Sequence, residues 1–146
     1  MNVRIPKIAP TVLAAVFLIA QFFQPARGNP PADPAASFEA VAQPPGPVAE
    51  VLARSCRDCH SHQTRWPWYS RVSPVSWLVA KDVKEGRARL NLSQWNLYGP
   101  EMAQLRMRAM CDEARFGAMP PKYYTPLHRD SRLNAADVAA LCAMVF

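Results

Sequence analysis

The residues best suited to chemistry form one short run, Cys56-Arg57-Asp58-Cys59-His60. This C-x-x-C-H spacing is typical of c-type haem attachment. Two thiols three positions apart, at the end of a helix, reach the two vinyl groups along one edge of a porphyrin. The following imidazole then lies beneath the iron. The run therefore predicts one haem c, bonded covalently through Cys56 and Cys59, with His60 as a ligand of its iron.

Two other roles for a C-x-x-C pair fit the sequence less well. A thioredoxin-like redox pair requires a βαβ context, and no strand pattern accompanies this one. Half of a zinc site would require a second close pair of Cys or His. The remaining cysteines, Cys111 and Cys142, are far apart in the sequence. The pattern therefore favours haem over either alternative.

An electron-transferring haem iron generally has a second axial ligand, and we expect Met119 to supply it. Met119 lies in a loop after a helix end, and Pro120 and Pro121 stiffen the backbone that holds its sulfur. It follows His60 by 119 − 60 = 59 residues. Three alternatives remain open: a methionine that only fills a gap under the loop, ligation by His128 in the same loop, and an open iron. His62 is too close to His60 to reach the other face.

The N-terminus predicts export. Residues 2–7 form a short positive region, residues 8–23 form an apolar run, and residues 26–28 supply small residues at the positions that a signal peptidase needs. The apolar run is slightly short for a bilayer span. Residues 1–28 are therefore a signal peptide or an uncleaved membrane anchor that tethers the chain through residues 8–23. Both alternatives place the rest of the chain in the periplasm or another extracytoplasmic compartment.

Export also bears on the other two cysteines. In an oxidising compartment thiols tend to form disulfides or attachment points. Cys111 and Cys142 lie on the last two predicted long helices. We expect a disulfide between them, and the alternative is two buried thiols in an apolar interface.

The organisation of the chain predicts one all-α domain. Residues 29–46 are rich in Pro and Ala and are predicted to form an extended, poorly packed linker. The folded domain is assigned to residues 47–146. Apolar periodicity and helix-end residues predict about four helices around the haem. Their expected positions are 47 to 56, 74 to 89, 100 to 116 with Gly117 as a left-handed cap, and a last helix that Asn134 caps.

Smaller features complete the expected haem surroundings. Ser93 is expected to cap a short turn that carries Trp95, and an apolar stripe (Val75, Leu78, Val79, Val83) runs along the 74–89 helix. Arg65 and Arg71 are candidate partners of the haem propionates, with solvated arginines as the alternative. The aromatic residues that offer flat area to the porphyrin, or else an ordinary aromatic core, are Trp66, Trp68, Tyr69, Trp77 and Trp95.

Several runs resemble those of a known family. Cys56 to Ser61, residues 64–70, residues 74–79 and Met119-Pro120-Pro121 are similar to the bacterial haem-binding domain family of cytochrome-c-like proteins. The resemblance extends from about Pro45 to the C-terminus. It implies a cytochrome c-like helical fold with haem c, and it carries the attachment roles onto the C-x-x-C-H residues. The assignment of Met119 rests on its loop and on likeness to cytochrome c methionine loops.

Charge excludes one class of partner. The formal net charge is +6 for the whole chain and 14 − 11 = +3 without residues 1–28. The basic residues form no stripe, so a nucleic-acid partner is not expected. We expect an electron carrier, not an enzyme, with His60 and Met119 as axial ligands and with redox partners that the sequence does not identify. A haem-based sensor with a displaceable sixth ligand is the alternative, and peroxidase activity is disfavoured because no distal acid–base pair is evident.

Overall fold

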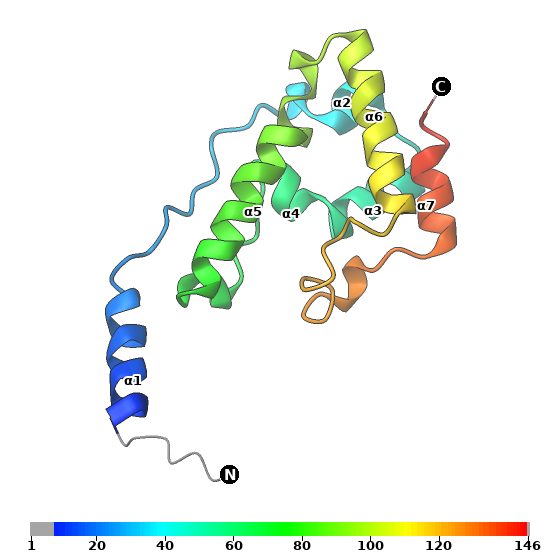
Figure 1. Cartoon of the computed structure of the whole chain (residues 1–146). Coiled ribbons are helices and arrows are strands. Elements are labelled where there is room, and N and C mark those ends of the chain that lie inside the picture. The colour runs from blue at the N-terminus through cyan, green and yellow to red at the C-terminus, as the bar shows by residue number, and fades with distance from the viewer. Residues whose placement is uncertain (1–7, 146) are drawn as a thin grey trace. The chain divides into compact units, whose positions relative to one another are not determined.

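The computed structural model describes residues 8–145, and within this range the chain is helical with no strand. The all-α prediction is therefore confirmed. Figure 1 shows the elements, which follow one another along the chain. The α-helices are α1 (Ile8–Ala20), α2 (Phe38–Ala42), α3 (Gly46–Ser55), α4 (Arg57–His60), α5 (Val75–Arg89), α6 (Pro100–Arg115) and α7 (Ala135–Cys142). Short 3-10 helices are η1 (Pro34–Ala36), η2 (Trp68–Arg71), η3 (Leu92–Leu97) and η4 (Arg129–Ser131).

The described chain divides into two compact units. Unit 1 consists of residues 8–28 and 66–82, and unit 2 consists of residues 29–65 and 83–145. Helix α5 passes from the first unit to the second. Unit 1 thus combines the predicted leader with the aromatic segment. No helix among residues 8–145 has both the length and the apolar character needed to cross a membrane.

The hydrophobic core lies in unit 2. It draws side chains from α2, α3, η3, α6 and α7, and Trp95 packs edge-on against Phe38 and Tyr98. Trp95 is therefore an aromatic core residue, which was one of its two expected roles. The buried members are Phe38, Val48, Val51, Leu52, Leu92, Trp95, Met110, Ala114, Leu141 and Met144.

The expectation of an extended, poorly packed segment is wrong for residues 34–42. Ser37 caps α2 through the backbone N–H of Ala40, and Phe38 is completely buried in the core. Glu39 also pairs with Arg57 at 2.7 Å, which ties α2 to α4. This short helix could not be predicted from the sequence, because the surrounding prolines interrupt any longer apolar period.

Helix ends follow the predicted residues in most places. Asn134 and Asp137 form a capping box at the start of α7, and Gly117 after α6 has φ 64°. The prediction for Ser93 is wrong: the side chain of Asn91 caps η3 by accepting from the N–H of Ser93. Asn is as good an N-cap as Ser, so the sequence alone could not decide between neighbouring candidates.

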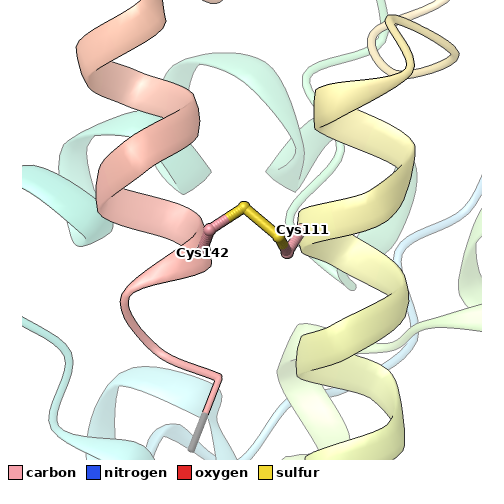
Figure 2. The surroundings of a disulfide bond; sticks show 2 residues. All are labelled: Cys111 and Cys142. Carbon is pink, nitrogen blue, oxygen red and sulfur yellow. A yellow bond between two sulfur atoms is a disulfide. The ribbon is translucent and has the colours of Figure 1, made fainter.

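A disulfide joins the last two long helices, as expected. Cys111 of α6 and Cys142 at the end of α7 are bonded, with their Cα atoms 4.7 Å apart, and Figure 2 shows the bridge between the two helices. This separation lies in the usual range for disulfides. The bond closes a loop with a sequence separation of 31.

We expect the double substitution Cys111→Ala/Cys142→Ala to lower the free energy of unfolding by about 3 kcal/mol, because closing a loop of this length restricts the unfolded chain. Urea unfolding followed by circular dichroism would measure this difference between the variant and the wild-type protein. A loss below about 1 kcal/mol would contradict a stabilising role for the bridge.

Candidate cofactor-binding site

The C-x-x-C-H run forms a single helical turn. Cys56 ends α3 and its carbonyl accepts from the N–H groups of Cys59 at 3.2 Å and His60 at 3.0 Å. These bonds start α4 and bring the two cysteines and the histidine onto adjoining positions of one turn. Both thiols lie outside the disulfide. Local backbone geometry therefore groups the three residues that the sequence singled out.

The His60 ring is oriented by backbone carbonyls. Its Nδ1 lies 2.9 Å from the carbonyl oxygen of Gly86 and 3.1 Å from that of Leu90. Because both partners are acceptors, Nδ1 carries the proton and donates, which leaves the Nε2 lone pair for a metal. Burial lowers the pKa of His60, although the two backbone hydrogen bonds act in the opposite direction. The neutral imidazole required of a ligand is thus favoured.

Gly86 lets α5 approach this turn closely. A Cβ added at Gly86 would lie 2.6 Å from the carbonyl oxygen of Cys59, closer than real Cβ atoms come. Arg87, the next residue, donates to the Ser61 carbonyl at 2.7 Å and to the Thr64 hydroxyl at 2.8 Å. The part of α5 in unit 2 therefore fixes both the histidine ring and the backbone that follows it.

Replacing Gly86 with alanine should displace α4 from α5 by a few tenths of an ångström or more, because the clash is with backbone atoms. We expect a destabilisation of about 2 kcal/mol, in the range of overpacking substitutions, and a broadened, partly high-spin haem spectrum. Absorption spectroscopy and thermal unfolding would measure the two effects. Ala88→Gly, on the same helix, is the control for changed helix propensity. Unchanged spectrum and stability in Gly86→Ala would contradict the close approach.

Cys56 is not activated as a thiolate. The pKa of the Cys56 thiol is raised to about 12, chiefly by burial and also by the neighbouring Cys59, whereas Arg54 acts in the opposite direction. Reactive redox cysteines have lowered pKa values, so this thiol does not fit a thioredoxin-like site. Across residues 8–145, His, Cys, Asp and Glu side chains form no group of three that could hold a metal ion on their own. The zinc alternative is therefore not supported either.

A cavity of about 270 Å³ in unit 2 brings three of the four predicted haem residues together, whereas Cys59 is not among its lining residues. Cys56, His60 and Met119 all line it, although they come from α3–α4 and from the loop after α6. Its size is close to the lower limit of small-molecule sites. The remaining lining residues are mainly apolar, with three charged exceptions: Ser55, Arg89, Leu90, Arg106, Ala109, Met110, Glu113, Ala114, Pro120, Leu133 and Leu141.

The end of α6 holds Met119 at this cavity. The N–H of Gly117 donates to the Ala114 carbonyl at 3.2 Å, and the N–H of Ala118 donates to the Glu113 carbonyl at 3.0 Å. This is the Schellman pattern, which requires the left-handed conformation of Gly117. The N–H of Met119 also donates to Glu113, at 3.2 Å. Met119 is 37% exposed, so its side chain lies at the edge of the cavity.

The two other histidines have structural partners. The His128 ring stacks on Tyr124 with ring centroids 4.0 Å apart, and His128 is not among the cavity residues. The Nε2 atom of His62 lies 2.9 Å from the side-chain nitrogen of Asn91. Of Met119 and His128, only Met119 lines the cavity that His60 also lines.

Asp58, inside the C-x-x-C-H run, connects this turn to the methionine loop. Its carboxylate accepts from the backbone and side chain of Arg65 and from the Tyr124 hydroxyl, at 3.1 to 3.2 Å. Arg65 is thus engaged with a carboxylate of the chain itself. Arg71 and four of the five aromatic candidates belong to unit 1, and the suggestion that they contact the haem stays a prediction.

Sequence reasoning missed two cavity arginines, Arg89 and Arg106. The Nε atom of Arg106 is buried and, within the described residues, has no hydrogen-bond partner. A buried polar group without a partner is costly, so an acceptor is expected at this place. An apolar cavity with two arginines fits a porphyrin, which has a flat apolar ring and two propionate carboxylates. Nothing in the sequence distinguished these arginines from the others of the chain.

Comparison with known proteins agrees with this fit. Residues 15–145 match the family described as Haem-binding domain. The match covers 145 − 15 + 1 = 131 of 146 residues. No curated protein and no solved structure matches the chain significantly.

Proposed function

This chain belongs to the haem-binding domain family and binds haem, and on that basis we propose that it is a mono-haem c-type cytochrome that carries electrons outside the cytoplasm. The observation that carries the proposal is the cavity shared by Cys56, His60 and Met119. Attachment thiols, a neutral imidazole and a thioether sulfur are the groups that such a cytochrome requires.

The two thiols provide the attachment. Each sulfur adds to one vinyl group of the porphyrin, so the S–H bond and the vinyl π bond break and a C–S bond forms. The thiol hydrogen goes to the neighbouring vinyl carbon, and no electrons are gained or lost. Because Cys56 and Cys59 share one turn with His60, attachment also holds the iron close to the imidazole. A shallow cavity is then sufficient to retain the haem.

The axial residues determine what the bound iron can do. Haem supplies an iron that changes between ferric and ferrous by one electron. His60 is held by two carbonyls, and Met119 contributes a soft thioether, a combination that raises the reduction potential. The apolar lining disfavours extra charge and keeps water away from the iron. These features support electron transfer without substrate chemistry.

The cavity arginines are proposed to pair with the propionates. We expect Arg106→Leu to lower the midpoint potential by roughly 40–60 mV, the one-electron equivalent of losing about 1 kcal/mol of favourable charge interaction. Arg108→Leu is the matched control, because Arg108 is an exposed residue of the same helix. Potentiometric titration of both variants would measure the difference. Equal potentials in the two variants would contradict the pairing.

Carbon monoxide tests electron transfer against the sensor alternative. A firmly bound Met119 should make ferrous protein bind carbon monoxide slowly, whereas its iron should be oxidised and reduced reversibly at one potential. Stopped-flow mixing and a redox titration of the same sample would measure both. Rapid binding in the wild-type protein would support a sensor with a displaceable sixth ligand and would contradict the electron-carrier proposal.

Two features support the proposed extracytoplasmic location, the disulfide and the N-terminal sequence pattern. A disulfide such as Cys111–Cys142 persists in an oxidising compartment, and the N-terminal charge and apolar run favour export. Fractionation of cells that express the full chain should place the haem-stained protein outside the cytoplasm. Haem-stained protein confined to the cytosol would contradict this part of the proposal.

A further inference from the structure

Unit 1 has polar residues inside and apolar residues outside. Three serines, Ser70, Ser73 and Ser76, are completely buried. Twelve large apolar side chains of the same unit are exposed, among them Trp68 at 77% and Phe22 at 87%. These exposed side chains are Val12, Leu13, Val16, Phe17, Leu18, Ile19, Phe22, Phe23, Trp68, Val75, Trp77 and Leu78. The apolar stripe at the start of α5 therefore faces outward, not into a core.

The end of the leader is an integral part of this unit. Gln21 and Ser73 exchange two hydrogen bonds, in which the Gln21 amide donates to the Ser73 carbonyl at 3.2 Å and accepts from the Ser73 N–H at 3.0 Å. Gln24 donates to the Ser73 hydroxyl at 2.8 Å. Arg27 donates to the Ser70 carbonyl at 2.8 Å. Removal of residues 1–28 would take away all of these partners.

The aromatic segment is also bonded to the leader. The indole N–H of Trp77 donates to the Phe23 carbonyl at 2.6 Å. The rest of the Trp77 ring belongs to the exposed apolar surface. A tryptophan whose indole N–H has a hydrogen-bond partner and whose apolar ring is exposed is typical of membrane–water interfaces. Small residues buried between elements, as the three serines are, are likewise typical of packing in lipid.

Water is an unfavourable solvent for such a surface. Removal of large apolar side chains from water is favourable, and soluble proteins rarely expose large apolar patches. The charge of the segments also suits one particular surface. Residues 8–28 and 66–82 contain three basic side chains, Arg27, Arg71 and Lys81, and one acidic side chain, Asp82. Basic residues next to an apolar surface favour anionic lipid headgroups.

We infer that the leader is retained and that unit 1 inserts into an anionic lipid bilayer, with Trp68 and Trp77 in contact with lipid. The twelve exposed apolar side chains supply the lipid-facing surface, and the hydrogen bonds from Gln21, Gln24 and Arg27 hold α1 and the aromatic segment together. The cytochrome would then be bound to the membrane by two segments that are far apart in the sequence. This inference does not depend on the haem.

The test uses the full chain, expressed with its leader in a host that matures c-type cytochromes. Intact mass of the membrane-extracted protein should show that residues before Asn29 are retained. In phosphatidylcholine–phosphatidylglycerol vesicles, brominated acyl chains should quench about half of the tryptophan fluorescence relative to unbrominated ones, since two of the four tryptophans face lipid. Trp68→Phe/Trp77→Phe should remove most of this quenching and leave the core residue Trp95 in place. If the double variant is poorly folded, Trp77→Phe alone replaces it in the quenching experiment and should remove part of the quenching.

Three results would overturn the inference. The first is a mature chain that begins at Asn29. The second is equal fluorescence in brominated and unbrominated vesicles, and the third is a stable dimer whose tryptophans are shielded without lipid. The haem absorption of the same sample separates this inference from the cytochrome proposal. A normal haem spectrum without quenching rejects only the membrane surface, and quenching in a colourless sample rejects only the cytochrome.

Discussion

Cys56→Ala/Cys59→Ala protein is expected to lose its haem completely under denaturing conditions. Without either sulfur no thioether can form, and the cavity of about 270 Å³ alone offers only non-covalent contacts. Haem staining after denaturing electrophoresis should fall from one haem per chain to background. Each single variant keeps one sulfur and should still stain, with a shifted spectrum because one vinyl group stays unsaturated.

The other cysteine pair provides the matched control. Cys111→Ala/Cys142→Ala also removes two cysteines, but these are joined to each other at the α6–α7 contact. This variant should stain as strongly as the wild-type protein at equal amounts of chain. Staining that persists in Cys56→Ala/Cys59→Ala, or that is lost equally in both double variants, would contradict attachment through the C-x-x-C-H thiols.

Met119→Ala is expected to have the second-largest effect. The proposed site would then have no sixth protein ligand, so the spectrum should change from low spin to high spin and the weak sulfur-to-iron band of the ferric state should disappear. The midpoint potential should fall by on the order of 0.1–0.3 V, part of the roughly 0.8 V range that axial ligands set. Haem staining should be unchanged, because attachment does not involve Met119.

Two further variants make the assignment specific. Met119→His should restore a low-spin spectrum at a potential below that of the wild-type protein, since imidazole replaces a thioether. Met102→Ala removes an exposed methionine from α6 that is not among the cavity residues, and it should change neither spectrum nor potential. A low-spin spectrum that persists in Met119→Ala would show that another residue supplies the sixth ligand.

The sequence predicted the features that depend on local patterns. The C-x-x-C-H run forms one turn, because consecutive backbone bonds in α3 and α4 group its residues whatever surrounds them. Gly117 ends α6 in the left-handed conformation, which glycine adopts at little cost. Met119 follows directly in the loop after this helix end and lines the cavity; the position of the loop was predicted from Gly117, Pro120 and Pro121, together with likeness to cytochrome c methionine loops. Asn134 likewise caps α7.

The sequence did not predict features that depend on tertiary packing. Phe38 lies among prolines and alanines, and only the core formed with α3, η3, α6 and α7 makes its burial favourable. The close approach at Gly86 had a signal, because an isolated glycine within a helix often has a packing reason. Arg106 had no such signal in the sequence, since its buried Nε without a hydrogen-bond partner is evident only in the folded structure.

For the first half of α5, the sequence predicted the helix but not the environment of its apolar side chains. The stripe of Val75 and Leu78 has the period of a helix that packs on a core, and periodicity identified the helix correctly. Period alone does not say which solvent the stripe faces. In unit 1 the buried positions are serines, of which Ser70 and Ser73 bond to the leader and Ser76 bonds to Ser73. The environment of the stripe therefore follows from contacts across more than 40 residues of sequence.

The most direct test of the central claim is the intact mass of the exported chain, measured after denaturation and treatment with a thiol-alkylating reagent without reduction. The proposal predicts a coloured protein whose mass is that of the chain plus one haem, with no alkyl group added, because two sulfurs are in thioethers and two are in the disulfide. A colourless chain that carries two alkyl groups, from a host competent in cytochrome c maturation, would contradict it.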